Sequence, residues 1–280
     1  MKKTSVALAT ALTLASIANT QAVELEVSIT NLTQANFFTP RLVVAHTAEA
    51  DLFEVGTQAS VALAWLAEAG VIEDAQNPAS AGRNFEAVLG PANTDNLNNT
   101  WRRFGGLTPP ASTLTYTFDT LDYPLLSVAA MLIPTNDAFL GLDSIEIPTE
   151  PGTYKYYLNA YDAGTELNDE LNSTRTDITA EGGAALGGYA LPGVAGAGAP
   201  GIAPTMGTGG NGVAVQVGFD EDGTALASPT EVVDGTDGPV HIHRNTLGDT
   251  SSTAGASDLD STVHRWLNPV AMVTIVVPAS

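Results

Sequence analysis

The chain has no cysteine and few basic residues. Ten lysines and arginines stand against 31 aspartates and glutamates, which gives a formal net charge of -21 over 280 residues. Without thiols the fold has no disulfide and no cysteine nucleophile, so its own core, alone or with a metal, must stabilise it. Nucleic acid and anionic membranes are excluded as partners, because such polyanions are held by lysine and arginine. This acidity is compatible with divalent cations.

Long hydrophobic runs are also missing. Residues 1–22 are typical of an export signal, with Lys2 and Lys3 before the apolar run VALATALTLASIA and a small-x-small cleavage site ending at Ala22. No later segment reaches the roughly 20 apolar residues of a membrane span. We therefore expect a mature chain from Val23 that is secreted or periplasmic.

Most of the remaining sequence is typical of short strands. VELEVSITNLT alternates Leu25, Val27 and Ile29 with polar residues, which is the period of a half-buried strand. Comparable segments are RLVVAHT, STLTYTFDT, LSVAAMLIP, GTYKYYLNAYD, GVAVQVGF, PVHIHRN and AMVTIVVPA. Residues 23–280 are therefore predicted to form one all-β domain, an antiparallel sandwich.

Two segments interrupt this strand pattern. TQASVALAWLAEAG, residues 57–70, has apolar residues at helical spacing, a threonine that can cap and a closing glycine, so we expect one short helix packed on the edge of the sheet. Residues 182–219 carry no charge and are rich in glycine, alanine and proline, which predicts a long surface loop.

Catalytic signatures are missing, and we expect no enzyme. The chain has neither a Gly-x-Ser-x-Gly elbow nor a Gly-Lys-Ser/Thr phosphate loop. Histidines leave one alternative open: His241 and His243 lie two apart on a predicted strand and could bind zinc or copper together with His264 or His46. This alternative predicts a metal carrier or metalloenzyme.

The carboxylates offer a second kind of metal site. TNDAFLGLDSIEI places Asp137 and Asp143 in an apolar run, and NAYDAGTELNDE places Asp162 and Glu166 around a Gly-Thr turn. Loops at strand ends supply the carboxylate and carbonyl oxygens that calcium prefers. The alternative is that these are solvated acidic turns, with aspartate as a local cap.

Four segments, in order, are similar to a known family. Residues 45–70 contain an Ala-His pair, an aromatic residue, a glycine, an Ala-Ser helix start and an Ala-Glu-x-Gly finish; PTNDAFLGLDSIEI, YDAGTE and LNPVAMVTIVV follow. This arrangement resembles the spondin N-terminal domain. The resemblance implies a sandwich related in topology to C2 domains, with a calcium ion at one end held by Asp137, Asp162 and Glu166. It also implies that Asp143 braces a turn.

The same resemblance implies an exported binding or adhesion module whose partner is an extracellular protein or polysaccharide. Two residues depart from the family pattern. Glu166 stands where the family has aspartate, which lengthens the arm by one methylene, and Phe139 shifts the aromatic one position because Ala138 replaces a tryptophan. The thrombospondin-type repeats and cysteines of the animal members are also missing.

Overall fold

The computed structural model describes residues 24–76, 81–133, 135, 137–165, 239–248, 261–262 and 264–279. The predicted signal, the Gly-rich segment 182–219 and the strand predicted at GVAVQVGF lie outside these residues. Ten strands and two helices occur in the described parts of the chain. Their order is β1 (Glu24–Asn31), β2 (Phe37–Phe38), β3 (Arg41–His46), α1 (Val61–Ala69), α2 (Phe85–Leu89), β4 (Asn99–Phe104), β5 (Thr113–Asp119), β6 (Leu125–Ile133), β7 (Ala138–Glu146), β8 (Gly152–Asp162), β9 (His241–Ile242) and β10 (Ala271–Val277).

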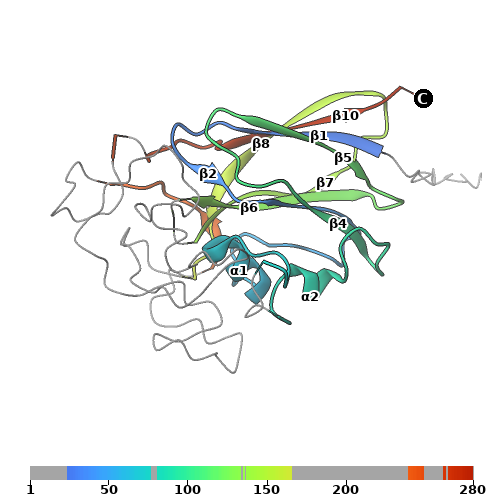
Figure 1. The fold of residues 1–280 in the computed structure, drawn as a ribbon, viewed down its shortest axis with the longest axis horizontal. Helices are drawn as coiled ribbons and strands as arrows, with labels where there is room; N and C mark the ends of the chain where they lie inside the picture. Colours follow the sequence, from blue (N-terminus) through green and yellow to red (C-terminus); the bar gives the residue numbers. More distant parts are fainter. Residues whose placement is uncertain are drawn as a thin grey trace, which may run out of the picture.

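The strands form one antiparallel path in the order β4-β3-β6-β7-β8-β10-β1-β5, with β2 added beside β6 and β9 beside β8. Strand β8 joins two layers: residues 152–158 pair with β10, and residues 159–162 pair with β7. Figure 1 shows β5, β1 and β10 above β6, β7 and β4, with β8 crossing between the layers. The predicted all-β antiparallel sandwich is confirmed.

The core has two parts because the strands of one layer are covered on both faces. Val128, Ala130 and Leu132 of β6 face the other sheet layer and pack with Val27 and Ile29 of the alternating strand β1. The intervening residues of the same layer pack under the helices, in a second cluster that includes Leu42, Val44, Ala129 and Phe139. This double coverage explains why β3 and β6 are almost continuously apolar.

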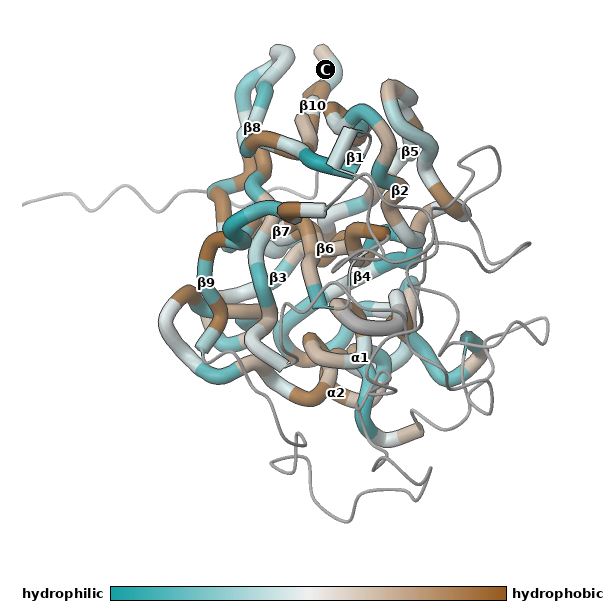
Figure 2. The backbone as a smooth tube through the Cα atoms, turned by 90° about the vertical axis from the view of Figure 1, so that its left-hand side faces the viewer, coloured by the Kyte–Doolittle hydropathy of each residue, from teal (hydrophilic) through white to brown (hydrophobic). Residues whose placement is uncertain are grey.

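Helix α1 lies on the face of the sheet. Ser60 caps its first turn by accepting a hydrogen bond from the Leu63 amide, and Gly70 ends it with a positive φ of 66°. The helix contacts β6 and β7, which are interior strands, so it does not lie at the sheet edge as expected. The cap is also three residues later than Thr57. Figure 2 shows both helices on one side of the layer that contains β3, β4, β6 and β7.

Four elements lie outside the predicted segments: β2, α2, β4 and β7. The last is the TNDAFLGLDSIEI segment, which is a strand and not a turn. Leu142 pairs with Val128 and Ile145 pairs with Leu126, so Asp143 and Ser144 together oppose the single residue Ser127 in a β-bulge. The exposed Asp143 therefore belongs to a bulge, where its carboxylate accepts a hydrogen bond from the Ser144 hydroxyl at 2.7 Å.

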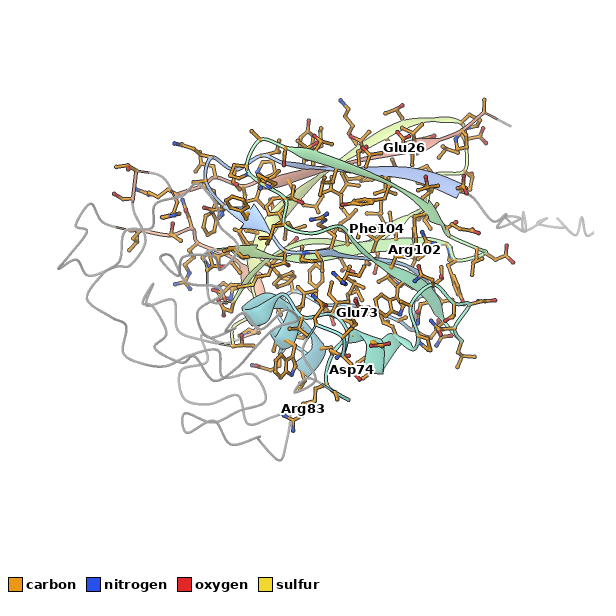
Figure 3. All side chains as sticks on the ribbon, viewed as in Figure 1. Glu26, Glu73, Asp74, Arg83, Arg102 and Phe104 are labelled. Atoms are coloured by element: carbon orange, nitrogen blue, oxygen red, sulfur yellow. The ribbon has the colours of Figure 1, made fainter. Side chains whose placement is uncertain are left out.

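Side chains join the two ends of the strand path. The ring of Phe104, on β4, stacks on Tyr116, on β5, with 4.3 Å between centroids. Figure 3 places Phe104 in the space between the two sheet layers. Arg41 is fully buried beside this pair, and its guanidinium donates to the Tyr116 hydroxyl and to the Thr39 and Gly106 carbonyls. Burial lowers the pKa of Arg41, while the tyrosine opposes that shift.

A glycine in β7, Gly141, lies close to two aromatic rings, and a stability measurement can test this packing. A Cβ on Gly141 would lie 2.5 Å from Cζ of Phe53 and 3.1 Å from Cδ2 of Tyr161. Gly141→Ala should therefore lower the free energy of unfolding by about 1–3 kcal/mol, the usual range for overpacking. Urea unfolding measures this difference. Gly106→Ala is the control, since a Cβ there meets nothing within 4 Å; equal losses in the two variants would contradict the packing argument.

Candidate metal centre

Two aspartates meet where β7 begins and β8 ends. Asp137 directly precedes β7, Asp162 is the last residue of β8, and Ala138 pairs with Asp162 across the antiparallel ladder. The amide of Ala163 donates to the Asp137 carbonyl at 3.1 Å, which extends the pairing by one step. Strand register thus places both carboxylates at the same end of the sandwich, and both are buried, at 1% and 0% exposure.

The turn after β8 holds both carboxylates through its backbone. Oδ1 of Asp162 accepts from the Gly164 amide at 2.7 Å, and Oδ2 of Asp137 accepts from the Thr165 amide at 3.1 Å. Gly164 has a φ of 68°, a conformation that glycine adopts without strain. The hydroxyl of Thr165, the residue whose amide contacts Asp137, is buried and has no hydrogen-bond partner among the described residues.

A third potential ligand comes from a distant part of the chain. Strand β9 adds to the end of β8, with Asp162 opposite His241, and the His243 amide donates to the Ala160 carbonyl at 3.0 Å. This pairing brings His243, Asp137 and Asp162 together, with one ligand atom from each within 4.8 Å of the others. Nδ1 of His243 accepts from the Asn245 amide at 3.0 Å.

The neighbouring histidine, His241, faces the carboxylate of Asp162. Nε2 of His241 lies 3.6 Å from Oδ2 of Asp162, and its Nδ1 lies 2.9 Å from the Pro239 carbonyl oxygen. The His241 side chain is 26% exposed, whereas Asp162 is at 1%. His241 therefore lies between solvent and the buried carboxylate of Asp162.

The residues expected to bind metal are only partly brought together. Asp137 and Asp162 meet as the family resemblance implies, whereas Glu166 lies outside the described residues. His46 is not placed to bind a metal, because both of its ring nitrogens are in hydrogen bonds: Nε2 with the Ser127 hydroxyl at 2.8 Å and Nδ1 with the Thr47 carbonyl at 2.7 Å. Within the described ranges, Asp137, Asp162 and His243 are the one group of three such side chains at ligand distance, so the trio of His241, His243 and His264 is not assembled.

This set of atoms fits a divalent cation. Burial of two like charges is unfavourable unless other groups compensate them, and a cation between the carboxylates does so. A separation of up to 4.8 Å is about twice the calcium–oxygen distance of roughly 2.4 Å. Carboxylates, a hydroxyl and the carbonyls of the turn are the oxygen donors that calcium uses, while an imidazole adds affinity for transition ions.

Asp51 and Asp143 form a second carboxylate pair, apart from this cluster. Burial, the charge of Asp143 and a hydrogen bond between the two carboxyl groups raise the pKa of Asp51, against an opposing hydrogen bond from the Phe53 amide. The negative charges of Asp51 and Asp143 therefore repel each other at neutral pH.

Comparison with known proteins identifies the family. The family model described as Spondin_N matches residues 31–181, more than half of the chain. The chain therefore belongs to the spondin N-terminal domain family and contains an extracellular domain. The match includes Asp137 and Asp162 but ends before His241 and His243. No curated protein matches the chain.

None of the described helices has the length and apolar character needed to cross a membrane.

Removing His243 should destabilise the fold even without a cation. His243→Ala leaves the Asn245 amide without its acceptor and removes the ring that lies 5.1 Å from Trp266. We expect a loss of about 1–3 kcal/mol in the free energy of unfolding, measured by urea unfolding in excess chelator. Arg244→Ala, at the exposed neighbouring position, is the control and should change little. An unchanged His243→Ala protein would contradict the structural role of this ring.

The Asp51–Asp143 pair predicts that removing the charge of Asp51 raises the stability of the fold in a pH-dependent way. Because the pKa of Asp51 is raised in the folded state, folding favours its protonated form, and stability is lost as the pH rises through that raised pKa. Asp51→Asn keeps the oxygen that accepts from Phe53 and removes the repulsion. Its thermal midpoint should exceed that of the wild type at pH 7, by a margin that shrinks at pH 4. Glu54→Gln removes a charge from the same loop and should not reproduce this pattern.

Proposed function

We propose that the chain is an exported, non-catalytic binding module that holds a calcium ion between Asp137 and Asp162. The observation that supports this most directly is the meeting of two buried carboxylates at adjacent strand ends, with ligand atoms within 4.8 Å. Calcium is plentiful outside cells, and a chain without disulfides gains stability from any ligand that binds only the folded state.

In this proposal the ion ties together three segments that are far apart in sequence. Asp137 supplies the start of β7, Asp162 the end of β8, and the backbone of the following turn lies against both carboxylates. Because β9 pairs with the end of β8, fixing Asp162 also fixes the segment that carries His241 and His243. The cation thus orders the surface at this end of the sandwich for a partner.

The proposed partner is an extracellular protein or polysaccharide that offers an acidic oxygen to the ion. Calcium takes six to eight oxygens, more than two carboxylates and a hydroxyl supply, so coordination positions are left for a carboxylate or hydroxyl of another molecule. Adhesion through the bound ion is the expected use of such a site. A partner that binds equally well after the cation is stripped out would contradict this step.

A non-catalytic role is consistent with the surroundings of Ser127 and His46, a hydroxyl beside an imidazole. The Ser127 hydroxyl lies 2.8 Å from Nε2 of His46, but both residues are fully buried. The Ser127 oxygen also accepts from the Ser144 amide, in the bulge of β7. This pair therefore supports the sheet and is closed to a substrate.

The calcium site is tested by thermal unfolding of the purified chain after chelation, with calcium titrated back. Calcium at 100 times its Kd should raise the free energy of unfolding of the wild type by about 2.7 kcal/mol. Asp162→Asn should abolish that gain, because it removes one of the two buried negative charges that would hold the ion. Asp122→Asn removes an equal charge at an exposed position and should retain the full gain. A wild-type chain that does not respond to calcium would overturn the proposal.

A further inference from the structure

A surface cavity of about 390 Å³ lies where three segments of the chain meet. Residues 32–34 follow β1, Asn245 follows β9, and residues 265–267 precede β10. Neither Asp137 nor Asp162 lines this cavity. It is therefore a different place from the candidate metal centre, with walls of its own.

Hydrogen bonds fix the walls of this cavity. The Asn245 side chain pairs with the backbone of Trp266: its amide donates to the Trp266 carbonyl, and its oxygen accepts from the Trp266 N–H at 3.0 Å. In the loop after β1, the Thr33 hydroxyl donates to the Asn36 carbonyl at 2.8 Å, and the Asn36 side chain donates to the His264 carbonyl at 3.1 Å. The three segments are thus held together before anything binds, which lowers the entropy cost of binding.

Two leucines that line the cavity are exposed to water. Leu267 is 84% exposed and Leu32 is 44% exposed. The ring of Trp266, which also lines the cavity, is only 5% exposed and lies 5.1 Å from the ring of His243. Exposed apolar side chains that gather around a hollow mark interaction sites, whereas single ones are ordinary. The cavity therefore fits a partner that has apolar side chains.

Two arginines accompany these leucines in a chain that has few basic residues. Arg265 lines the cavity, Arg244 directly precedes Asn245, and both arginines are exposed. In the part of the chain that the structure describes, neither guanidinium is in an ion pair. Arginine is enriched at protein interfaces and binds carboxylates through two parallel hydrogen bonds. The group that complements this side of the cavity is therefore a carboxylate.

From the cavity, the leucines and the arginines together we infer that this surface binds a segment of a partner protein that carries a carboxylate next to apolar side chains. An aspartate or glutamate of the partner pairs with the Arg265 guanidinium, and a neighbouring apolar side chain enters the cavity against Leu32 and Leu267. An acidic polysaccharide offers carboxylates without such side chains, so the leucines favour a protein. The inference goes beyond the proposed calcium site, because binding here needs no cation.

The experiment begins with a library of displayed random heptapeptides, selected on the purified chain in excess chelator. The selection is repeated on Arg265→Glu and on Arg102→Glu, which change the net charge equally; Arg102 is an exposed arginine of β4 outside the cavity. The wild type and Arg102→Glu should enrich peptides that have aspartate or glutamate beside leucine, isoleucine or phenylalanine. Arg265→Glu should lose this enrichment, because like charges at an interface repel each other.

An enriched peptide, synthesised with capped ends, then gives affinities by calorimetric titration. Arg265→Glu and Leu267→Ser should each weaken its binding by at least about tenfold, as should replacement of its acidic residue by the corresponding amide. Leu97→Ser removes a leucine that is 92% exposed outside the cavity, so this variant and Arg102→Glu should stay within about twofold of the wild type. Unchanged thermal midpoints show that the variants are folded.

A fluorescence readout locates the bound peptide. Trp266 lines the cavity, whereas Trp65 and Trp101 are fully buried, so the peptide should change the tryptophan emission of the wild type and not that of Trp266→Phe.

Several results would overturn the inference: no enrichment, enriched peptides without acidic residues, or equal binding to the wild type and Arg265→Glu. Polygalacturonate that binds through Arg265 more tightly than any selected peptide would also overturn it, in favour of an acidic polysaccharide. A wild-type dimer that Arg265→Glu dissociates would overturn it in favour of a second copy of this chain. A chain that binds the peptide but not calcium would contradict the proposed function and support this inference.

Discussion

The register between β7 and β8 is the constraint on which the site depends. Pairing of Ala138 with Asp162 puts the carboxylates of Asp137 and Asp162 at one end of the sandwich, where both are buried. Two buried like charges are tolerated only with strong compensation. Backbone amides of the following turn donate to the two carboxylates at 2.7 and 3.1 Å, and under the proposed function a cation bound between them adds to this compensation.

The rest of the fold keeps that register in place. Strand β8 belongs to both layers, so its end cannot slide without disturbing its pairing with β10. Phe53 packs edge-on against Phe139 at 5.1 Å and at a tilt against Tyr161 at 5.2 Å, which covers the last pairs of β7 and β8. The close approach at Gly141 allows this packing.

Much of this fold can be predicted from sequence, because in several strands apolar and polar residues alternate according to the face they occupy. Leu25, Val27 and Ile29 face the core, and polar residues face water. Strand β7 is hard to predict because it carries features that usually end a strand. Gly141 leaves room for the ring of Phe53, and Asp143 lies in a β-bulge. Both look like turn residues when the partner strands are not known.

Only part of the candidate site can be predicted from sequence, because strand pairing over a long distance leaves no local pattern. Asp137 and Asp162 lie in short motifs that resemble a family, and the structure brings them together. The pairing of β9 with β8 cannot be predicted, because a two-residue strand that begins 79 positions after Asp162 leaves no pattern in the sequence to show which strand it pairs with. From sequence the carboxylates and the histidines therefore look like rival candidate sites, whereas in the structure His241 and His243 both lie near Asp162.

The most direct test of the central claim is a crystal structure of the purified chain grown with calcium, with the anomalous signal recorded to identify the ion. If calcium lies between the two carboxylates, an anomalous peak will be bonded at roughly 2.3–2.6 Å to oxygens of both Asp137 and Asp162. Calcium-grown crystals in which these carboxyl groups share a proton or a water, with no anomalous peak between them, would contradict the claim.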